Sequence, residues 1–131
     1  MLYDLIDGKN WAVENHFAAS DKVGLWGVSY GGYATLSALT MSPEEFVCGV
    51  AVNAPSNLET FMKSVPPYWK MNQWYLYVGN PKFDHELLSQ RSPLTHAAAL
   101  KAPLLVIHGA NDARVNRPQS DELVRTFRGL G

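Results

Sequence analysis

The chain has 131 residues, of which 47% are hydrophobic and 18% charged, and its formal net charge is −1. This length allows one domain of ordinary size, and the composition supports a hydrophobic core and excludes wholesale disorder. A nearly neutral chain gives no reason to expect nucleic acid or an anionic membrane as a partner, and we expect neither.

The compartment is predicted from two further features. No stretch of the sequence is long and apolar enough to span a bilayer, and the N-terminus lacks the layout of a signal peptide. The single cysteine, Cys48, cannot form an internal disulfide, and its place in an apolar run fits a small core residue. We therefore expect a cytoplasmic protein.

The first predicted elements are a helix and a strand. Residues 4–18 predict an amphipathic helix, and a polar connection leads from it to residues 23–28, an apolar run that predicts a strand buried on both faces. The apolar positions that share one face of the helix are Leu2, Ile6, Val13 and Phe17.

The strand ends in Gly27-Val28-Ser29-Tyr30-Gly31, and small or apolar residues then recur at helical spacing. Strand, Gly-x-Ser-x-Gly and helix form the layout of a nucleophile elbow, in which the serine hydroxyl stands clear of the sheet. The turn needs a strained backbone at the serine, and we expect side chains at positions 27 and 31 to collide. Ser29 is therefore the candidate nucleophile, and the Tyr30 N–H, at the helix N-terminus, is the candidate oxyanion donor.

The middle of the chain carries the aromatic residues. After a turn, residues 46–52 predict a second buried strand, and Pro66 and Pro67 interrupt any helix in the segment that follows. Large rings in irregular chain after a strand can line an apolar pocket beside the serine, or they can pack the core, and both interpretations stay open. These rings are Phe61, Tyr68, Trp69, Trp74, Tyr75 and Tyr77.

The last third predicts two short helices at residues 84–90 and 92–100 and a strand at 104–109. A loop follows at 110–117, and a final helix at 118–130. Three buried strands alternating with helices predict an α/β fold: a parallel sheet of at least three strands with helices on both faces. Working residues collect at the carboxyl ends of such strands, where Asp112 follows the third strand. By position alone, two interpretations of Asp112 have equal weight: it orients a catalytic imidazole, or it caps a turn.

Two motifs are in register with a known family: Gly-Val-Ser-Tyr-Gly-Gly-Tyr (27–33) and Leu-Leu-Val-Ile-His-Gly-Ala-Asn-Asp-Ala-Arg-Val (104–115). Three further segments agree: Ala-Pro-Ser-Asn-Leu (54–58), Val-Pro-Pro-Tyr-Trp-Lys (65–70) and Arg-Ser-Pro-Leu-Thr-His (91–96). The sequence resembles the prolyl oligopeptidase family of serine peptidases, in its acylaminoacyl-peptidase-like branch. The resemblance implies that residues 1–131 are the central part of an α/β-hydrolase catalytic domain. It places the upstream strands, a propeller domain and the C-terminal histidine segment outside this sequence.

The resemblance also implies roles in a Ser–Asp–His triad. Ser29 corresponds to the nucleophile, the Tyr30 N–H to an oxyanion donor and Asp112 to the residue that orients the base. Arg114 corresponds to a side chain that holds a carbonyl of the substrate backbone, the alternative being a surface ion pair. The positions matching the apolar pocket for the side chain before the scissile bond are Phe61, Tyr68 and Trp69.

The triad histidine of the family falls beyond residue 131. Among the histidines present, His108 is the alternative base, because it lies on the strand that leads to Asp112. We expect a peptide or acyl substrate, an acyl-enzyme on Ser29, and no cofactor or metal. A carboxylesterase and a folded fragment without activity are the alternatives. Because strand edges would be exposed, we expect the isolated chain to form a homo-oligomer or to exchange elements with a copy of itself.

Overall fold

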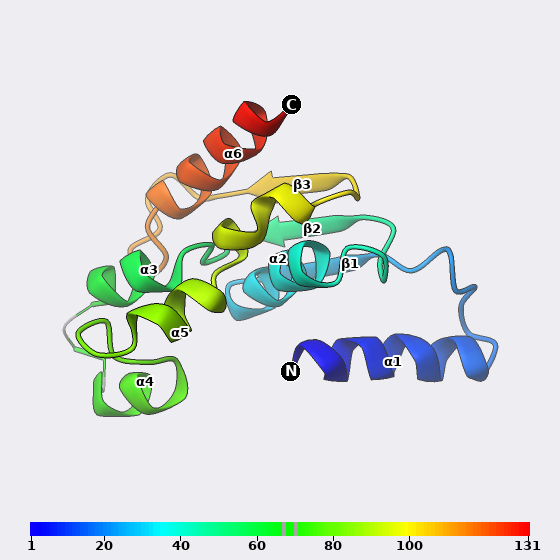
Figure 1. The fold of residues 1–131 in the computed structure, drawn as a ribbon, viewed down its shortest axis with the longest axis horizontal. Helices are drawn as coiled ribbons and strands as arrows, with labels where there is room; N and C mark the ends of the chain where they lie inside the picture. The colour runs from blue at the N-terminus through cyan, green and yellow to red at the C-terminus, as the bar shows by residue number, and fades with distance from the viewer. Residues whose placement is uncertain (67, 70) are drawn as a thin grey trace.

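A computed structural model describes residues 1–66, 68–69 and 71–131 of the protein. Its centre is a parallel sheet of three strands in the order β1-β2-β3 (Figure 1). The strands are β1 (Leu25–Val28), β2 (Gly49–Val52) and β3 (Leu104–Ile107). Their register places Trp26, Val50 and Leu105 in one row across the sheet. The α/β class with a parallel sheet is therefore confirmed.

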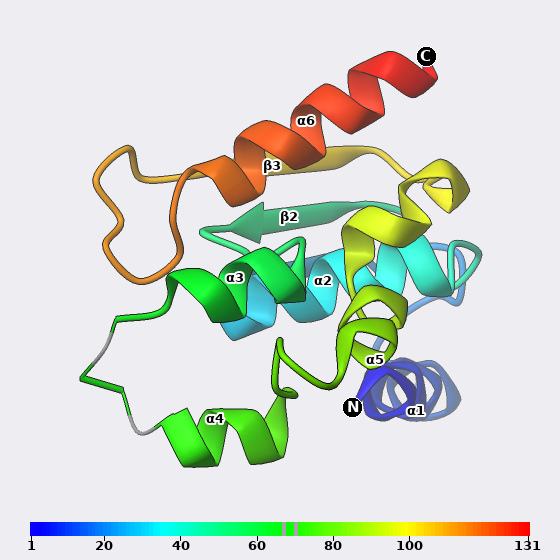
Figure 2. The ribbon, with the colours of Figure 1, turned by 60° about the vertical axis from the view of Figure 1, so that its left-hand side comes forward.

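The helices connect the strands. They are α1 (Leu2–Glu14), α2 (Tyr30–Met41), α3 (Leu58–Ser64), α4 (Met71–Tyr77), α5 (His85–Gln90), the 3₁₀ helix η1 (Pro93–Ala99) and α6 (Pro118–Leu130). The strand arrows point toward the end of the molecule that holds α3, α4 and α5 (Figure 1). Figure 2 shows the loop between β3 and α6 beside α3 at the same end. Every helix among the described residues is too short or too polar to cross a bilayer.

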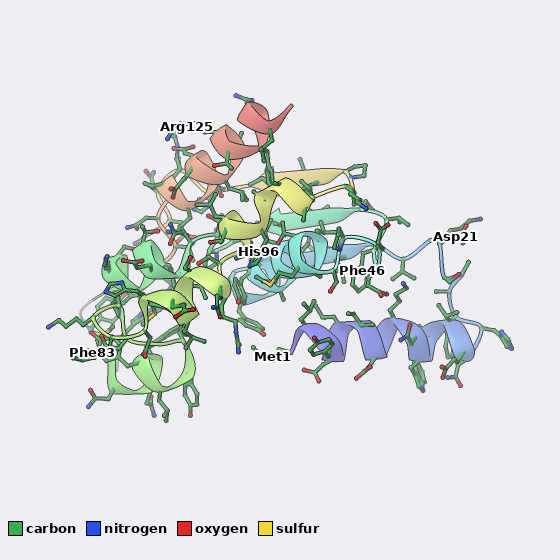
Figure 3. The ribbon with its side chains drawn as sticks, in the orientation of Figure 1. Met1, Asp21, Phe46, Phe83, His96 and Arg125 are labelled. Carbon is green, nitrogen blue, oxygen red and sulfur yellow. The ribbon has the colours of Figure 1, made fainter. Side chains whose placement is uncertain are left out.

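The core lies on one side of the sheet. Leu36 of α2 and Leu123 of α6 pack with Ala51 of β2. A second cluster joins Leu39 of α2 to Phe46, on which apolar residues of α1 pack (Figure 3). Small side chains along α2 let this helix lie close to β1 and β2, since each added methyl would push the layers apart.

The expected burial of the sheet on both faces is wrong for the described part of the chain. Alternate residues face away from the core, and four of them are exposed: Trp26 (70%), Leu105 (55%), Ile107 (46%) and Val28 (45%). An unbroken apolar run shows that both faces suit apolar partners, but it does not show that these partners lie in the same segment. The described helices cover one face.

Several local predictions also need correction. The segment predicted as irregular contains α3 and α4, and the α3 start is capped by Asn57, whose Oδ1 accepts from the Glu59 and Thr60 N–H groups. Residues 93–99 form a 3₁₀ helix. Cys48 is exposed just before β2, so it is no core residue. The helix interruption predicted at Pro66 and Pro67 lies partly outside the described residues.

Candidate active site

Ser29 occupies the sharp turn between β1 and α2. Its φ of 56° and ψ of −117° are strained for a residue with a side chain. Backbone hydrogen bonds hold it there: its N–H donates to the Val52 carbonyl at 2.8 Å, and its carbonyl accepts from the Tyr33 N–H at 3.0 Å. The hydroxyl belongs to an exposed residue at the carboxyl end of the sheet. The backbone is thus that of a nucleophile elbow.

Two glycines make this turn possible, and one of them differs from the prediction. A Cβ on Gly27 would overlap the backbone of Gly31 and Gly32, as predicted for position 27. A Cβ on Gly31 would meet nothing within 4 Å, so the predicted collision there is wrong. The tight position is Gly32, where a Cβ would lie 2.8 Å from Ala54 and 2.9 Å from the Val52 carbonyl oxygen. The first turn of α2 therefore packs on β1 and β2 through positions 27 and 32.

Tyr30 supplies the first amide of α2. The first N–H groups of a helix have no acceptor inside the helix, and they lie at its positive end. The Tyr30 hydroxyl donates to the Met1 sulfur at 2.8 Å, and burial raises the pKa of this phenol, with Tyr33 and Asp4 adding to the effect. The Tyr30 amide thus directly follows Ser29 at the positive end of α2, a position that favours negative charge.

Asp112 lies in the loop after β3, where it closes a turn. Its Oδ1 accepts from the Arg114 N–H at 2.8 Å and from the Val115 N–H at 3.0 Å. No described donor contacts the second oxygen, Oδ2. Burial raises the pKa of Asp112, but these two hydrogen bonds and the charges of His108 and Arg114 outweigh it, so that the net pKa is lowered. The carboxylate is therefore held as an anion with one oxygen available.

Ser29 and Asp112 share one edge of the sheet but do not touch. Ser29 follows β1 and Asp112 follows β3, with β2 between them. Both residues therefore lie at the carboxyl end of the sheet, and no hydrogen bond joins their side chains among the described residues. A serine and an aspartate at one edge of a sheet are two of the three groups that a Ser–His–Asp triad uses.

A cavity of about 290 Å³ opens beside Ser29. One wall is an aromatic cluster in which Trp69 stacks on Trp74 at 4.5 Å between ring centroids. Phe61 meets these two rings edge-on at 6.4 and 6.0 Å. Leu58 and Val115, both buried, close the apolar lining. Such a cavity suits an apolar side chain.

The structure brings some of the predicted pocket residues together and leaves one out. Phe61 and Trp69 line the cavity, whereas Tyr68 is 75% exposed and does not, because Trp69 takes the place against Trp74. Trp74 and Tyr77, which the sequence offered among the rings that can line a pocket, also line the cavity. Val78 and Arg91 are lining residues that the sequence did not indicate. Val78 directly follows α4, and its spacing of four residues from Trp74 is the helical signal that could have placed both on one face.

Arg114 also lines the cavity, two residues after Asp112. Its side chain is exposed, and no described carboxylate forms an ion pair with it. Arg91, at the end of α5, is a second lining residue, and its carbonyl accepts from the Tyr33 hydroxyl at 2.9 Å. The cavity therefore has an aromatic wall and two arginines in its lining.

The four histidines of the chain lie elsewhere, since none is among the described residues that line the cavity. His85 Nδ1 lies 3.3 Å from Glu59, and His96 Nε2 contacts the Gln90 carbonyl at 2.8 Å. His108 has both ring nitrogens engaged, with Ser120 and Val115. The alternative of His108 as the base therefore has no support in this geometry.

Comparisons with known proteins agree with this geometry. The whole chain, residues 1–131, matches the prolyl oligopeptidase family. It is 46% identical over 128 residues to dipeptidyl aminopeptidase BIII of Pseudoxanthomonas mexicana, covering 95% of this chain and 19% of that protein. It is 40% identical to dipeptidyl peptidase family member 6 of Caenorhabditis elegans, covering 95% and 17%.

The fold has solved counterparts. An uncomplexed acylaminoacyl peptidase of Pyrococcus horikoshii is similar with a TM-score of 0.88 and 31% identity, over 99% of this chain and 21% of that one. The chain thus spans about a fifth of the length of the proteins that it matches.

Proposed function

Because this chain belongs to the prolyl oligopeptidase family, we propose that it carries the nucleophile of a serine peptidase and hydrolyses peptide bonds through an acyl-enzyme on Ser29. One observation carries the proposal: the strained elbow at Ser29 opens on the cavity that Arg114 lines. The names of the relatives, which are peptidases, support the same reaction class.

In the proposed reaction, Ser29 Oγ attacks the carbonyl carbon of the scissile bond while an imidazole takes the hydroxyl proton. The Tyr30 N–H donates to the resulting oxyanion. The imidazole returns the proton to the leaving amine, and water then releases the acyl group by the same steps. Asp112 Oδ2 orients the imidazole, which we assign to a histidine outside these residues because none of the four present lines the cavity.

The same surfaces define the proposed substrate. The side chain before the scissile bond enters the aromatic cavity, whose rings favour apolar groups. The Arg114 guanidinium donates to a carbonyl of the substrate backbone, since it keeps its charge and offers several N–H donors in a fixed plane. An acyl-enzyme mechanism serves esters as well, so the carboxylesterase alternative concerns the substrate and not the chemistry.

Labelling with a fluorophosphonate tests the proposal, with Ser29→Ala as the matched control. We expect peptide mass spectrometry to find the label on Ser29 at a higher level than on the other serines. Labelling of Ser29 at the background level, in a sample that circular dichroism shows to be folded, would identify an inert fragment. Parallel assays with p-nitrophenyl esters and peptide anilides then separate esterase from peptidase activity.

We also propose a reducing, cytoplasmic compartment and self-association. The single cysteine, Cys48, supports the compartment, because a disulfide within the chain needs two. The exposed apolar face of the sheet supports association of two copies, since a second chain would cover it. This face carries Trp26, Val28, Leu105 and Ile107.

A further inference from the structure

His108 directly follows β3 and makes two hydrogen bonds that join the site to α6. Its Nδ1 lies 2.6 Å from the Ser120 hydroxyl, and its Nε2 lies 2.8 Å from the Val115 carbonyl oxygen. A carbonyl oxygen can only accept, so Nε2 must carry a hydrogen. In the neutral ring, Nδ1 then accepts from the Ser120 hydroxyl. Both contacts thus specify one orientation and one tautomer of the imidazole.

Val115 connects this histidine to the candidate site. Its N–H donates to Asp112 Oδ1 at 3.0 Å, while its carbonyl accepts from His108. Val115 is 3% exposed, lines the cavity with Ser29 and follows Arg114 directly. Val115 therefore lines the cavity and is hydrogen-bonded both to the Asp112 carboxylate and to the His108 imidazole.

The other side of His108 rests on a fixed support. Ser120, 6% exposed, stands in the first turns of α6 next to Gln119. Gln119 Oε1 accepts from the Ser56 and Asn57 N–H groups, each at 2.9 Å, so this end of α6 is tied to the start of α3. The histidine therefore connects a hydrogen-bonded junction between α6 and α3 to a loop that has little regular structure of its own.

We propose that His108 is a positioning residue that holds Val115, and through it the Asp112 carboxylate, in the orientation that leaves Oδ2 available. This assignment rests on the proposed role of Asp112. We call these two hydrogen bonds of His108, to Ser120 and to Val115, the brace. Its role differs from that of a base, because both ring nitrogens are engaged in it. It also differs from simple packing, which would depend on the shape of the side chain and not on the donor at Nε2.

Two variants separate the brace from packing. His108→Gln places an amide N–H₂ group near the position of Nε2, so it can still donate to the Val115 carbonyl. The shorter His108→Asn keeps a polar group near Ser120 but does not reach Val115. Amide hydrogen exchange of Arg114 and Val115 reports the loop, and a ¹³C titration of the Asp112 carboxyl reports its hydrogen bonds.

In His108→Asn we expect exchange at Arg114 and Val115 to be about fivefold faster or more, the effect of losing one net hydrogen bond. We expect the pKa of Asp112 to lie higher in His108→Asn than in His108→Gln, because both variants lose the charge of the imidazole but only His108→Asn also loses the hold on Val115. His108→Gln should restore the exchange rates. Equal values in the two folded variants, whether both like the wild type or both shifted, would overturn the brace. If both variants unfold, a long-range ¹H–¹⁵N spectrum of the wild type tests the brace instead. We expect the neutral imidazole of His108 to carry its hydrogen on Nε2, and a hydrogen on Nδ1 would contradict the brace.

These measurements do not depend on the labelling of Ser29. A failure of labelling with the Val115 and Asp112 effects intact would remove the proposed function and leave the brace. Labelling of Ser29 without those effects would remove the brace and leave the proposed function.

Discussion

At the scale of single residues, the two oxygens of Asp112 have different tasks. Oδ1 accepts from the Arg114 and Val115 N–H groups and shapes the loop, which is the turn interaction considered from the sequence. Oδ2 stays available for the proposed triad. The two interpretations of this aspartate are therefore compatible, because one carboxylate can close a turn and orient an imidazole at the same time.

The lowered pKa of Asp112 predicts a pH-dependent contribution to stability. A carboxylate with a lowered folded-state pKa stabilises the fold above about pH 4, and this contribution is lost as the pH falls through the folded-state pKa. Asp112→Asn keeps an oxygen for the loop but removes the charge. We expect urea unfolding to show a difference between wild type and variant that is largest near neutral pH and shrinks below about pH 4. A difference independent of pH would contradict the prediction.

The aromatic cavity predicts a side-chain preference that depends on Trp74. Removing this ring leaves Trp69 without its stacking partner and widens the cavity. In Trp74→Ala we expect labelling of Ser29 by a phosphonate with a phenylalanine side chain to slow about tenfold relative to one with an alanine side chain. The matched control is Tyr68→Ala, which lies outside the cavity and should keep the wild-type ratio. A change of equal size in both variants would remove Trp74 from the pocket.

At the scale of elements, the site depends on how closely α2 approaches the strands. The backbone of Gly31 and Gly32 lies against Gly27 of β1, and Gly32 lies against the end of β2. This contact presents the serine at the start of the helix, with a free amide next to it. The strain at Ser29 is thus held by packing on both sides of the turn.

Alanine at the two glycines of the motif should therefore have opposite effects. Gly27→Ala places a methyl group into the backbone of α2, and we expect it to lower the free energy of unfolding by about 3 kcal/mol. Gly31→Ala finds open space in a helix, where alanine is favoured over glycine by about 1 kcal/mol, so stability should be kept or raised. Chemical unfolding of both variants measures this, and a greater loss at position 31 than at position 27 would refute the described elbow.

At the scale of the whole molecule, one face of the sheet has no partner among the described residues. Trp26 and Leu105 lie in one row with Val50 between them, and Val28 and Ile107 lie in the row beside it. Parallel sheets are normally covered on both faces, and apolar surface of this kind drives association in water. The face is therefore the surface through which we expect two copies to meet.

Size-exclusion chromatography with light scattering checks this expectation. We expect the wild-type chain to elute as a dimer or larger species, and the double substitution Trp26→Lys and Leu105→Lys to weaken association by about tenfold or more. Phe83→Lys is the matched control, because Phe83 is 81% exposed and lies far from the sheet (Figure 3). A wild-type chain that stays monomeric at high concentration would contradict the proposal.

The sequence alone determined the α/β class, the strand positions within a few residues, the elbow at Ser29 and the loop with Asp112 and Arg114. These features are encoded locally, in apolar runs and in glycines that a turn requires. Tertiary structure decided the rest: which aromatic rings reach the cavity, with Trp74 there and Tyr68 outside it, Gly32 in place of Gly31 at the tight contact, the open sheet face and the two hydrogen bonds of His108. Each depends on residues that are distant in the chain and meet only after folding, and a local pattern does not specify such a partner.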